Sequence, residues 1–285
     1  MLKPIRITKQ RLHELKQETT AQDRAILKSL LSCRYLTGQQ LVRLHFSRNA
    51  ETPTAAAYAA YRCLNRLRDY GLIQSLQRRI GGVRAGSGSF VWTLTSGGFR
   101  LIHMDSTGVL PRRQFREPSP HFLAHTLLIS EAYLQFTEIC AQNNMTLSKV
   151  QFEPGCWRQY RNNAGKQLVL KPDLYAVTQG SGYEDCWFIE IDCDTETVAR
   201  ILDKCDRYIH YLRSGTEQKQ PDVFPYVIWI VPNEKRKRSL QKHICTQYPR
   251  GGQLFLVILP DELKDLLAGG AEKYIQNLDA KGGTS

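Results

Sequence analysis

The chain has 285 residues, of which 42% are hydrophobic and 23% are charged, as in a soluble globular protein with room for two domains. No apolar run approaches the roughly 20 residues that span a bilayer, which excludes a membrane-spanning helix. The first residues lead into a polar helix and not into a signal-peptide core, so we expect a cytoplasmic protein without a membrane partner. The eight cysteines show no Cys-x-x-Cys spacing, so reduced, buried thiols are expected and not a zinc ribbon or a redox motif.

The positive charge of the chain is concentrated in its first part. The net charge is +12; residues 1–117 hold 20 Lys and Arg against 7 Asp and Glu, whereas residues 118–285 hold 19 against 20. A basic module joined to a neutral one indicates a nucleic-acid binder attached to a second domain. We therefore expect double-stranded DNA as a partner.

Residues 1–105 are predicted to form a winged helix. Capping patterns at Thr20 and Thr37, and Pro53 in a first turn, start three helices. The third helix carries an apolar stripe, which is expected to comprise Ala57, Tyr61, Leu64 and Leu67. Strands are expected at 72–76 and 90–94. Three helices followed by a hairpin is the order of a winged helix, whose third helix enters the major groove of DNA.

The arginines that we expect to contact DNA lie on the polar side of the third helix and in the glycine-rich segment between the two strands. They are Arg62, Arg66, Arg78, Arg79 and Arg84. The alternative is a winged helix that binds protein and leaves a basic helix solvated. The arginines between the strands favour DNA, because they add to the same positive field.

Residues 106–117 are predicted to be a linker, residues 118–260 a second domain, and residues 261–285 a C-terminal helix with a disordered tail from Lys281. A long helix is expected to begin at Ser119 and Pro120. Its His121 and His125 lie one turn apart without further ligands, so we expect a packed or DNA-facing pair and not a metal site.

The second domain is predicted to continue with strands, interrupted by a helix that begins near Val198. The strands are expected at 150–153, 168–177, 186–192, 223–231 and 254–259. The basic run 235–238 is expected to be the solvated start of another helix, with a phosphate contact as the alternative.

Three carboxylates are predicted to meet at one edge of this sheet. Glu190 and Asp192 are two residues apart on a strand, so their side chains point to the same face. If the strands at 168–177 and 186–192 pair as a hairpin, Asp173 lies near them. Clustered acids are costly unless a cation neutralises them, which indicates a Mg²⁺ or Mn²⁺ site. The alternative is three solvated acids at strand ends.

The helix after the second of these strands places Lys204, Tyr208 and Tyr211 along one flank. The motif elements in chain order are Pro172-Asp173, Glu190-x-Asp192, Thr195-Glu196, Lys204 and Tyr208. This pattern resembles a variant of the PD-(D/E)xK nuclease motif. The variant is similar to the replication-relaxation family, which includes the MobC-type relaxases of mobilisable plasmids.

The resemblance implies an α/β fold, α+β overall, in which a winged helix precedes a restriction-endonuclease-like mixed-sheet domain. It implies a metal-dependent enzyme that nicks DNA at a plasmid or mobile-element transfer or replication origin, with other mobilisation or replication proteins as partners. Asp173, Glu190 and Asp192 would hold the metal, and Lys204 would stabilise charge on the phosphoryl group. Tyr208 or Tyr211 is an alternative nucleophile, and Glu131 on the long helix is a further candidate acid.

Asp192 departs from the nuclease pattern, because other nucleases with this motif carry lysine at its position. The second hypothesis is therefore a non-catalytic DNA-binding regulator of plasmid replication or transfer, with an inactive nuclease core.

Overall fold

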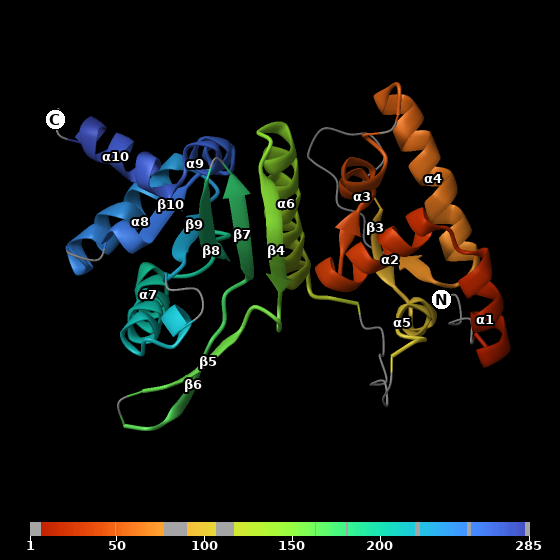
Figure 1. Cartoon of the computed structure of the whole chain (residues 1–285), viewed down its shortest axis with the longest axis horizontal. Helices are drawn as coiled ribbons and strands as arrows, with labels where there is room; N and C mark the ends of the chain where they lie inside the picture. The colour runs from red at the N-terminus through yellow and green to blue at the C-terminus, as the bar shows by residue number, and fades with distance from the viewer. Residues whose placement is uncertain are drawn as a thin grey trace. The chain divides into compact units, whose positions relative to one another are not determined.

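The computed structural model describes residues 7–48, 50–76, 90–106, 117–162, 164–180, 182–219, 223–249 and 252–282 (Figure 1). The chain forms two compact units, Met1–Leu134 and Gln135–Ser285, and the boundary falls inside helix α6 (Pro120–Gln142). Residues 107–116, which make up most of the expected linker, lie outside the described residues. Among the helices that the structure describes, none has the length and apolar character needed to cross a bilayer.

The first unit combines helices with a small antiparallel sheet in the order β1-β3-β2. Its elements are α1 (Lys9–Glu18), α2 (Ala21–Cys33), β1 (Leu36–Thr37), α3 (Gly38–His45), α4 (Pro53–Asp69), β2 (Ile73–Ser75), β3 (Val91–Leu94) and α5 (Ser96–Ile102). The predicted caps are confirmed, because Thr20 and Thr37 each complete a capping box at the start of α2 and α3. Helix α5 was not predicted.

Two of the four residues predicted for the buried face of α4, Ala57 and Tyr61, are exposed instead. Ala56, Ala60, Cys63, Leu64 and Leu67 are buried. Tyr61 is 64% exposed, as is the neighbouring Tyr58 at 63%. The small alanines allow close packing against α3, and the larger tyrosine side chains turn outward.

The second unit is built on a mixed sheet in the order β10-β9-β8-β7-β4. Strands β4, β7 and β8 pair antiparallel, whereas β8, β9 and β10 pair parallel. The elements are β4 (Thr146–Phe152), β5 (Arg158–Arg161), β6 (Gln167–Leu170), β7 (Leu174–Gly180), β8 (Tyr183–Ile191), α7 (Val198–Arg213), β9 (Tyr226–Ile230), α8 (Glu234–Gln247), β10 (Phe255–Ile258), α9 (Leu263–Gly269) and α10 (Ala271–Gly282).

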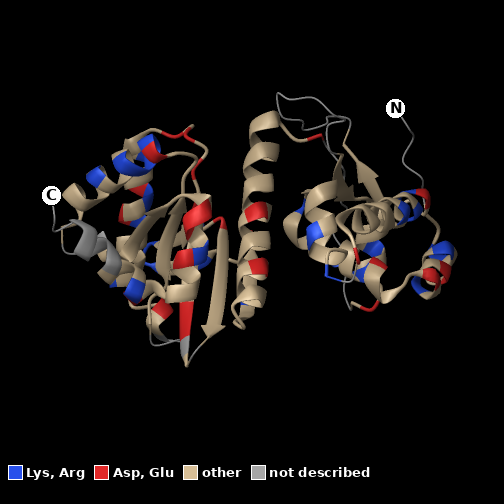
Figure 2. Ribbon diagram, turned by 90° about the horizontal axis from the view of Figure 1, so that it is seen from above, with Lys and Arg blue, Asp and Glu red and all other residues tan. Residues whose placement is uncertain are grey.

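Helices α7 and α8 cover one face of this sheet. Alternate strand residues such as Phe188, Trp229 and Val257 pack with Cys205 and Leu240 of the helices. The intervening strand residues are also buried, so both faces of the sheet are covered. Acidic and basic positions are interspersed over the helices of this unit (Figure 2), in keeping with its near-neutral charge.

The strand predicted at 168–177 is instead two strands that belong to different sheets. It divides at Pro172, which has no N–H to donate to a ladder. Strand β7 joins the main sheet, whereas β6 pairs with β5 in a separate hairpin that extends away from the body of the unit (Figure 1).

The C-terminal residues are more helical than predicted. Helix α10 reaches Gly282, past the expected start of the disordered tail at Lys281. Residues 283–285 lie outside the described part of the chain.

Candidate functional site

The hairpin of β7 and β8 brings two of the predicted acids together. Leu174 pairs with Ile189, so Asp173, directly before β7, lies next to Glu190 on β8. The Asp173 carboxylate is buried, and its Oδ2 accepts a hydrogen bond from the Ile191 N–H at 2.8 Å. The predicted pairing of these two segments is therefore confirmed.

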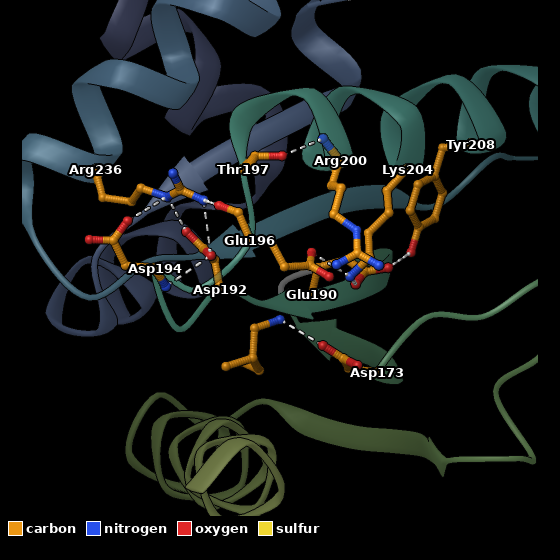
Figure 3. A network of polar contacts seen from close by, with 11 residues as sticks. Asp173, Glu190, Asp192, Asp194, Glu196, Thr197, Arg200, Lys204, Tyr208 and Arg236 are labelled. Carbon is orange, nitrogen blue, oxygen red and sulfur yellow. Dashed lines mark hydrogen bonds and ion pairs between the residues drawn. The ribbon is translucent and has the colours of Figure 1, made fainter. Parts of the chain in front are cut away.

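Glu190 points from the sheet toward α7, where two side chains meet its carboxylate (Figure 3). The Tyr208 hydroxyl donates to Oε1 at 2.6 Å, and Lys204 Nζ lies 3.5 Å from Oε2. Lys204 also lies 3.2 Å from a carboxylate oxygen of Glu196. Glu190 itself is only 2% exposed, so water contributes little to solvating its charge.

Burial and a neighbouring negative charge decide the protonation of this cluster. Burial, and after it the negative charge of Asp173, raise the pKa of Glu190 to about 8, although Lys204 and Tyr208 act in the opposite direction. Burial alone would lower the pKa of Lys204, but Glu190, Asp173 and Glu196 together raise it above its usual value while they are ionised. An additional cation near Asp173 and Glu190 would favour the ionised form of Glu190 at neutral pH.

Asp192 has a different partner, the guanidinium of Arg236 on α8. Arg236 Nε lies 2.5 Å from Asp192 Oδ2, and its Nη2 lies 3.2 Å from Oδ1. Arg236 also contacts Asp194 Oδ1 at 3.2 Å and donates to the Glu196 carbonyl at 2.7 Å. The pair therefore ties α8 to the segment that follows β8 (Figure 3).

The prediction that the basic run 235–238 is solvated is wrong for its two central residues. Arg236 and Lys237 are buried, Arg236 against Asp192 and Lys237 against Glu262. Asp192 explains the burial of Arg236, because a buried carboxylate needs a cation or several hydrogen bonds. Nothing in the local sequence indicated this partner, which is 44 residues away along the chain.

The predicted meeting of three carboxylates is thus reduced to two. Asp173 and Glu190 lie together, and Asp192 is bound by Arg236. Within the ranges that the structure describes, no group of three or more His, Cys, Asp and Glu side chains is arranged to hold a metal ion. His121 and His125, which both lie on α6, are among these described residues and belong to no such group.

Two other candidate residues contact partners outside this cluster. The Tyr211 hydroxyl donates to Glu217, which also pairs with Arg158 at 3.0 Å. Glu131 accepts hydrogen bonds from Arg43 at 2.5 Å and Gln40 at 3.1 Å, within the first unit. Tyr208 is therefore the predicted tyrosine that contacts the acids.

The arginines expected to contact DNA have different environments. Arg62 is exposed on α4, with its guanidinium 5.2 Å from the ring centre of Tyr58. Arg66 is partly exposed but pairs at 2.7 Å with Asp23, whose side chain is fully buried. Arg78, Arg79 and Arg84 lie outside the described residues.

The replication-relaxation family matches residues 27–227, a span that begins within α2, includes α3 to α7, and contains Asp173, Glu190, Asp192 and Lys204. No curated protein and no solved structure matched. Because the match covers more than half of the sequence and both compact units, the chain belongs to the replication-relaxation family.

Proposed function

We propose that the protein is a metal-dependent enzyme that nicks one strand of DNA at a plasmid or mobile-element replication or transfer origin. The proposal is carried by one observation: the buried acids Asp173 and Glu190 lie beside the half-buried Lys204. Two acids beside a lysine supply the groups for phosphoryl chemistry, with ligands for a cation and a positive charge for the transition state.

The order of elements supports a nuclease-like second unit. Helix α6, antiparallel strands β4, β7 and β8, helix α7 and parallel strand β9 follow the order that the PD-(D/E)xK resemblance implies. The acids lie beside the β7 and β8 pairing, where that motif would put them. In the first unit, α2, α3 and α4 followed by β2 and β3 support a winged helix that binds DNA.

Asp173 and Glu190 fit a Mg²⁺ or Mn²⁺ ion better than Asp192 does. Their adjacent buried carboxylates disfavour joint ionisation, which a divalent cation would relieve. Asp192 is already neutralised by Arg236, so we assign it to positioning the segment after β8. When bound, the ion would polarise the phosphate and lower the pKa of an attacking water. Lys204 would stabilise negative charge on the phosphoryl oxygens.

The second candidate function is a DNA-binding regulator without catalysis. It is favoured by the observation that all three acids already have protein donors. The Ile191 N–H donates to Asp173. Tyr208 and Lys204 donate to Glu190, and Arg236 donates to Asp192. Such a cluster needs no metal to be stable.

The test is nicking of supercoiled plasmid that carries the cognate origin, with and without Mg²⁺ or Mn²⁺. Asp173→Asn and Glu190→Gln are expected to abolish nicking and to leave DNA affinity nearly unchanged, because binding is assigned to the basic first unit. Asp203→Asn, an exposed acid on α7, is the matched control and should nick as the wild type does. A wild-type protein that binds the origin but neither binds divalent metal nor nicks would establish the regulator instead.

A further inference from the structure

The segment between Glu153 and Asp173 differs in charge from the rest of the second unit. It contains four basic residues and no acidic residue, although the whole unit, residues 135–285, holds 19 basic and 19 acidic residues. The four are Arg158, Arg161, Lys166 and Lys171. The β5 and β6 hairpin therefore carries a local positive charge within a nearly neutral unit.

The hairpin is a two-stranded ribbon that stands apart from the main sheet (Figure 1). Its strands pair from Arg158 with Leu170 to Arg161 with Gln167. The turn is closed by Asn162, whose side-chain oxygen accepts from the Ala164 and Lys166 N–H groups at 3.1 and 2.9 Å. A two-stranded antiparallel ribbon of this kind fits the width of the DNA major groove.

The base of the hairpin is anchored in the core, which fixes its direction. Tyr160 and Leu170 are buried among residues of the sheet and α7. Arg158 pairs with Glu217 at 3.0 Å, and its guanidinium lies 4.5 Å from the ring centre of Tyr175. Arg158 is thus part of the anchor and is not available to a ligand.

The other three basic residues are exposed. Within the described part of the chain, none of Arg161, Lys166 and Lys171 forms an ion pair. Lys171 Nζ lies 4.4 Å from the ring centre of Trp157, which holds this lysine beside the base of the ribbon. Only Pro172 separates it from Asp173. Lys171 thus lies near the acids, whereas Arg161 and Lys166 lie toward the turn of the ribbon. Three exposed cations along one ribbon are suited to a polyanion.

We propose that the β5 and β6 hairpin is a second DNA-binding element, which holds the phosphate backbone of duplex DNA beside Asp173 and Glu190. Arg161, Lys166 and Lys171 contact phosphates, and Arg158 anchors the ribbon. The inference rests on the proposed function in one respect, which is that the bound nucleic acid is the DNA substrate. The charge and geometry of the hairpin do not depend on whether Asp173 and Glu190 take part in cutting the strand.

The test compares two triple variants of the full chain that remove the same charge. The hairpin variant is Arg161→Gln, Lys166→Gln and Lys171→Gln, and the control is Lys242→Gln, Lys264→Gln and Lys273→Gln, at exposed positions on α8, α9 and α10. Affinity for a fluorescein-labelled duplex that contains the cognate origin is measured by fluorescence anisotropy over a salt series. Each lost phosphate contact lowers the slope of log affinity against log salt by about 0.9.

The hairpin variant should therefore lose about 2 to 3 from this slope, and bind at least about tenfold more weakly near 0.1 M salt. The control should retain the wild-type slope. A hairpin variant that keeps the wild-type slope and affinity would overturn the inference. Equal losses of slope and affinity in the hairpin and control variants would also overturn it, because they would indicate a general charge effect. Plasmid nicking is measured in parallel: if the wild type does not nick but the hairpin variant still loses slope, the proposed enzyme falls and the DNA-binding hairpin stands.

Discussion

Breaking the buried ion pair of Arg236 and Asp192 is predicted to destabilise the second unit strongly. The Asp192 side chain is fully buried and that of Arg236 is 9% exposed. Arg236→Ala leaves this carboxylate without a cation and removes the hydrogen bond to the Glu196 carbonyl. Loss of one partner from a buried pair costs about 3–5 kcal/mol. Replacing both, by Asp192→Asn with Arg236→Met, removes both charges and should recover most of that loss.

The measurement is urea unfolding followed by tryptophan fluorescence. Three of the four tryptophans, Trp157, Trp187 and Trp229, belong to the second unit, so the signal reports mainly on its unfolding. Arg238→Ala is the control on the same helix, because Arg238 is 81% exposed and should change stability by less than about 0.5 kcal/mol. A loss below about 1 kcal/mol in Arg236→Ala, or a double variant as unstable as the single one, would show that this ion pair does not stabilise the unit as predicted.

Two further predictions concern Glu190 and the arginines of α4. Because the pKa of Glu190 is raised from 4.5 to about 8, the folded protein retains a proton that the unfolded chain has lost. In the absence of divalent metal, wild type should lose stability relative to Glu190→Gln as pH rises from 4.5 to 8; parallel urea midpoints across that range would contradict this. Arg66→Ala should destabilise the first unit by about 1–2 kcal/mol, since Asp23 loses its cation but still accepts the Thr20 N–H. Arg62→Ala should change stability by less than about 0.5 kcal/mol yet weaken DNA binding. Thermal unfolding followed by circular dichroism compares the stability of the two variants. A larger loss of stability in Arg62→Ala than in Arg66→Ala would be inconsistent with the structure.

Features that depend on neighbouring residues could be predicted from the sequence. The caps at Thr20 and Thr37 involve groups three residues apart, and the β7 and β8 hairpin joins strands separated by a short turn. The proximity of Asp173 and Glu190 followed from that hairpin. These interactions are local, so propensity and alternation are sufficient to indicate them.

Features that depend on distant partners were missed. Asp192 was grouped with the other acids because strand alternation is visible in sequence, whereas its ion pair with Arg236 on α8 is not. The orientation of α4 depended on its packing against α3, so Ala57 and Tyr61 were assigned to the wrong face. Pro172 was a usable signal that the run 168–177 divides, because proline interrupts a strand ladder.

The hydrogen bond from Ile191 N–H to Asp173 links occupancy of the acids to the integrity of the sheet. Directly before Leu174, the first paired residue of β7, the Asp173 carboxylate accepts a hydrogen bond from a backbone N–H of the neighbouring strand. A ligand that draws this oxygen away must replace a hydrogen bond worth about 1 kcal/mol, and the end of β8 then becomes easier to open. Ligand affinity at Asp173 and local fraying of β8 are therefore thermodynamically coupled, so a substitution that loosens this strand end would also alter the affinity for the proposed cation.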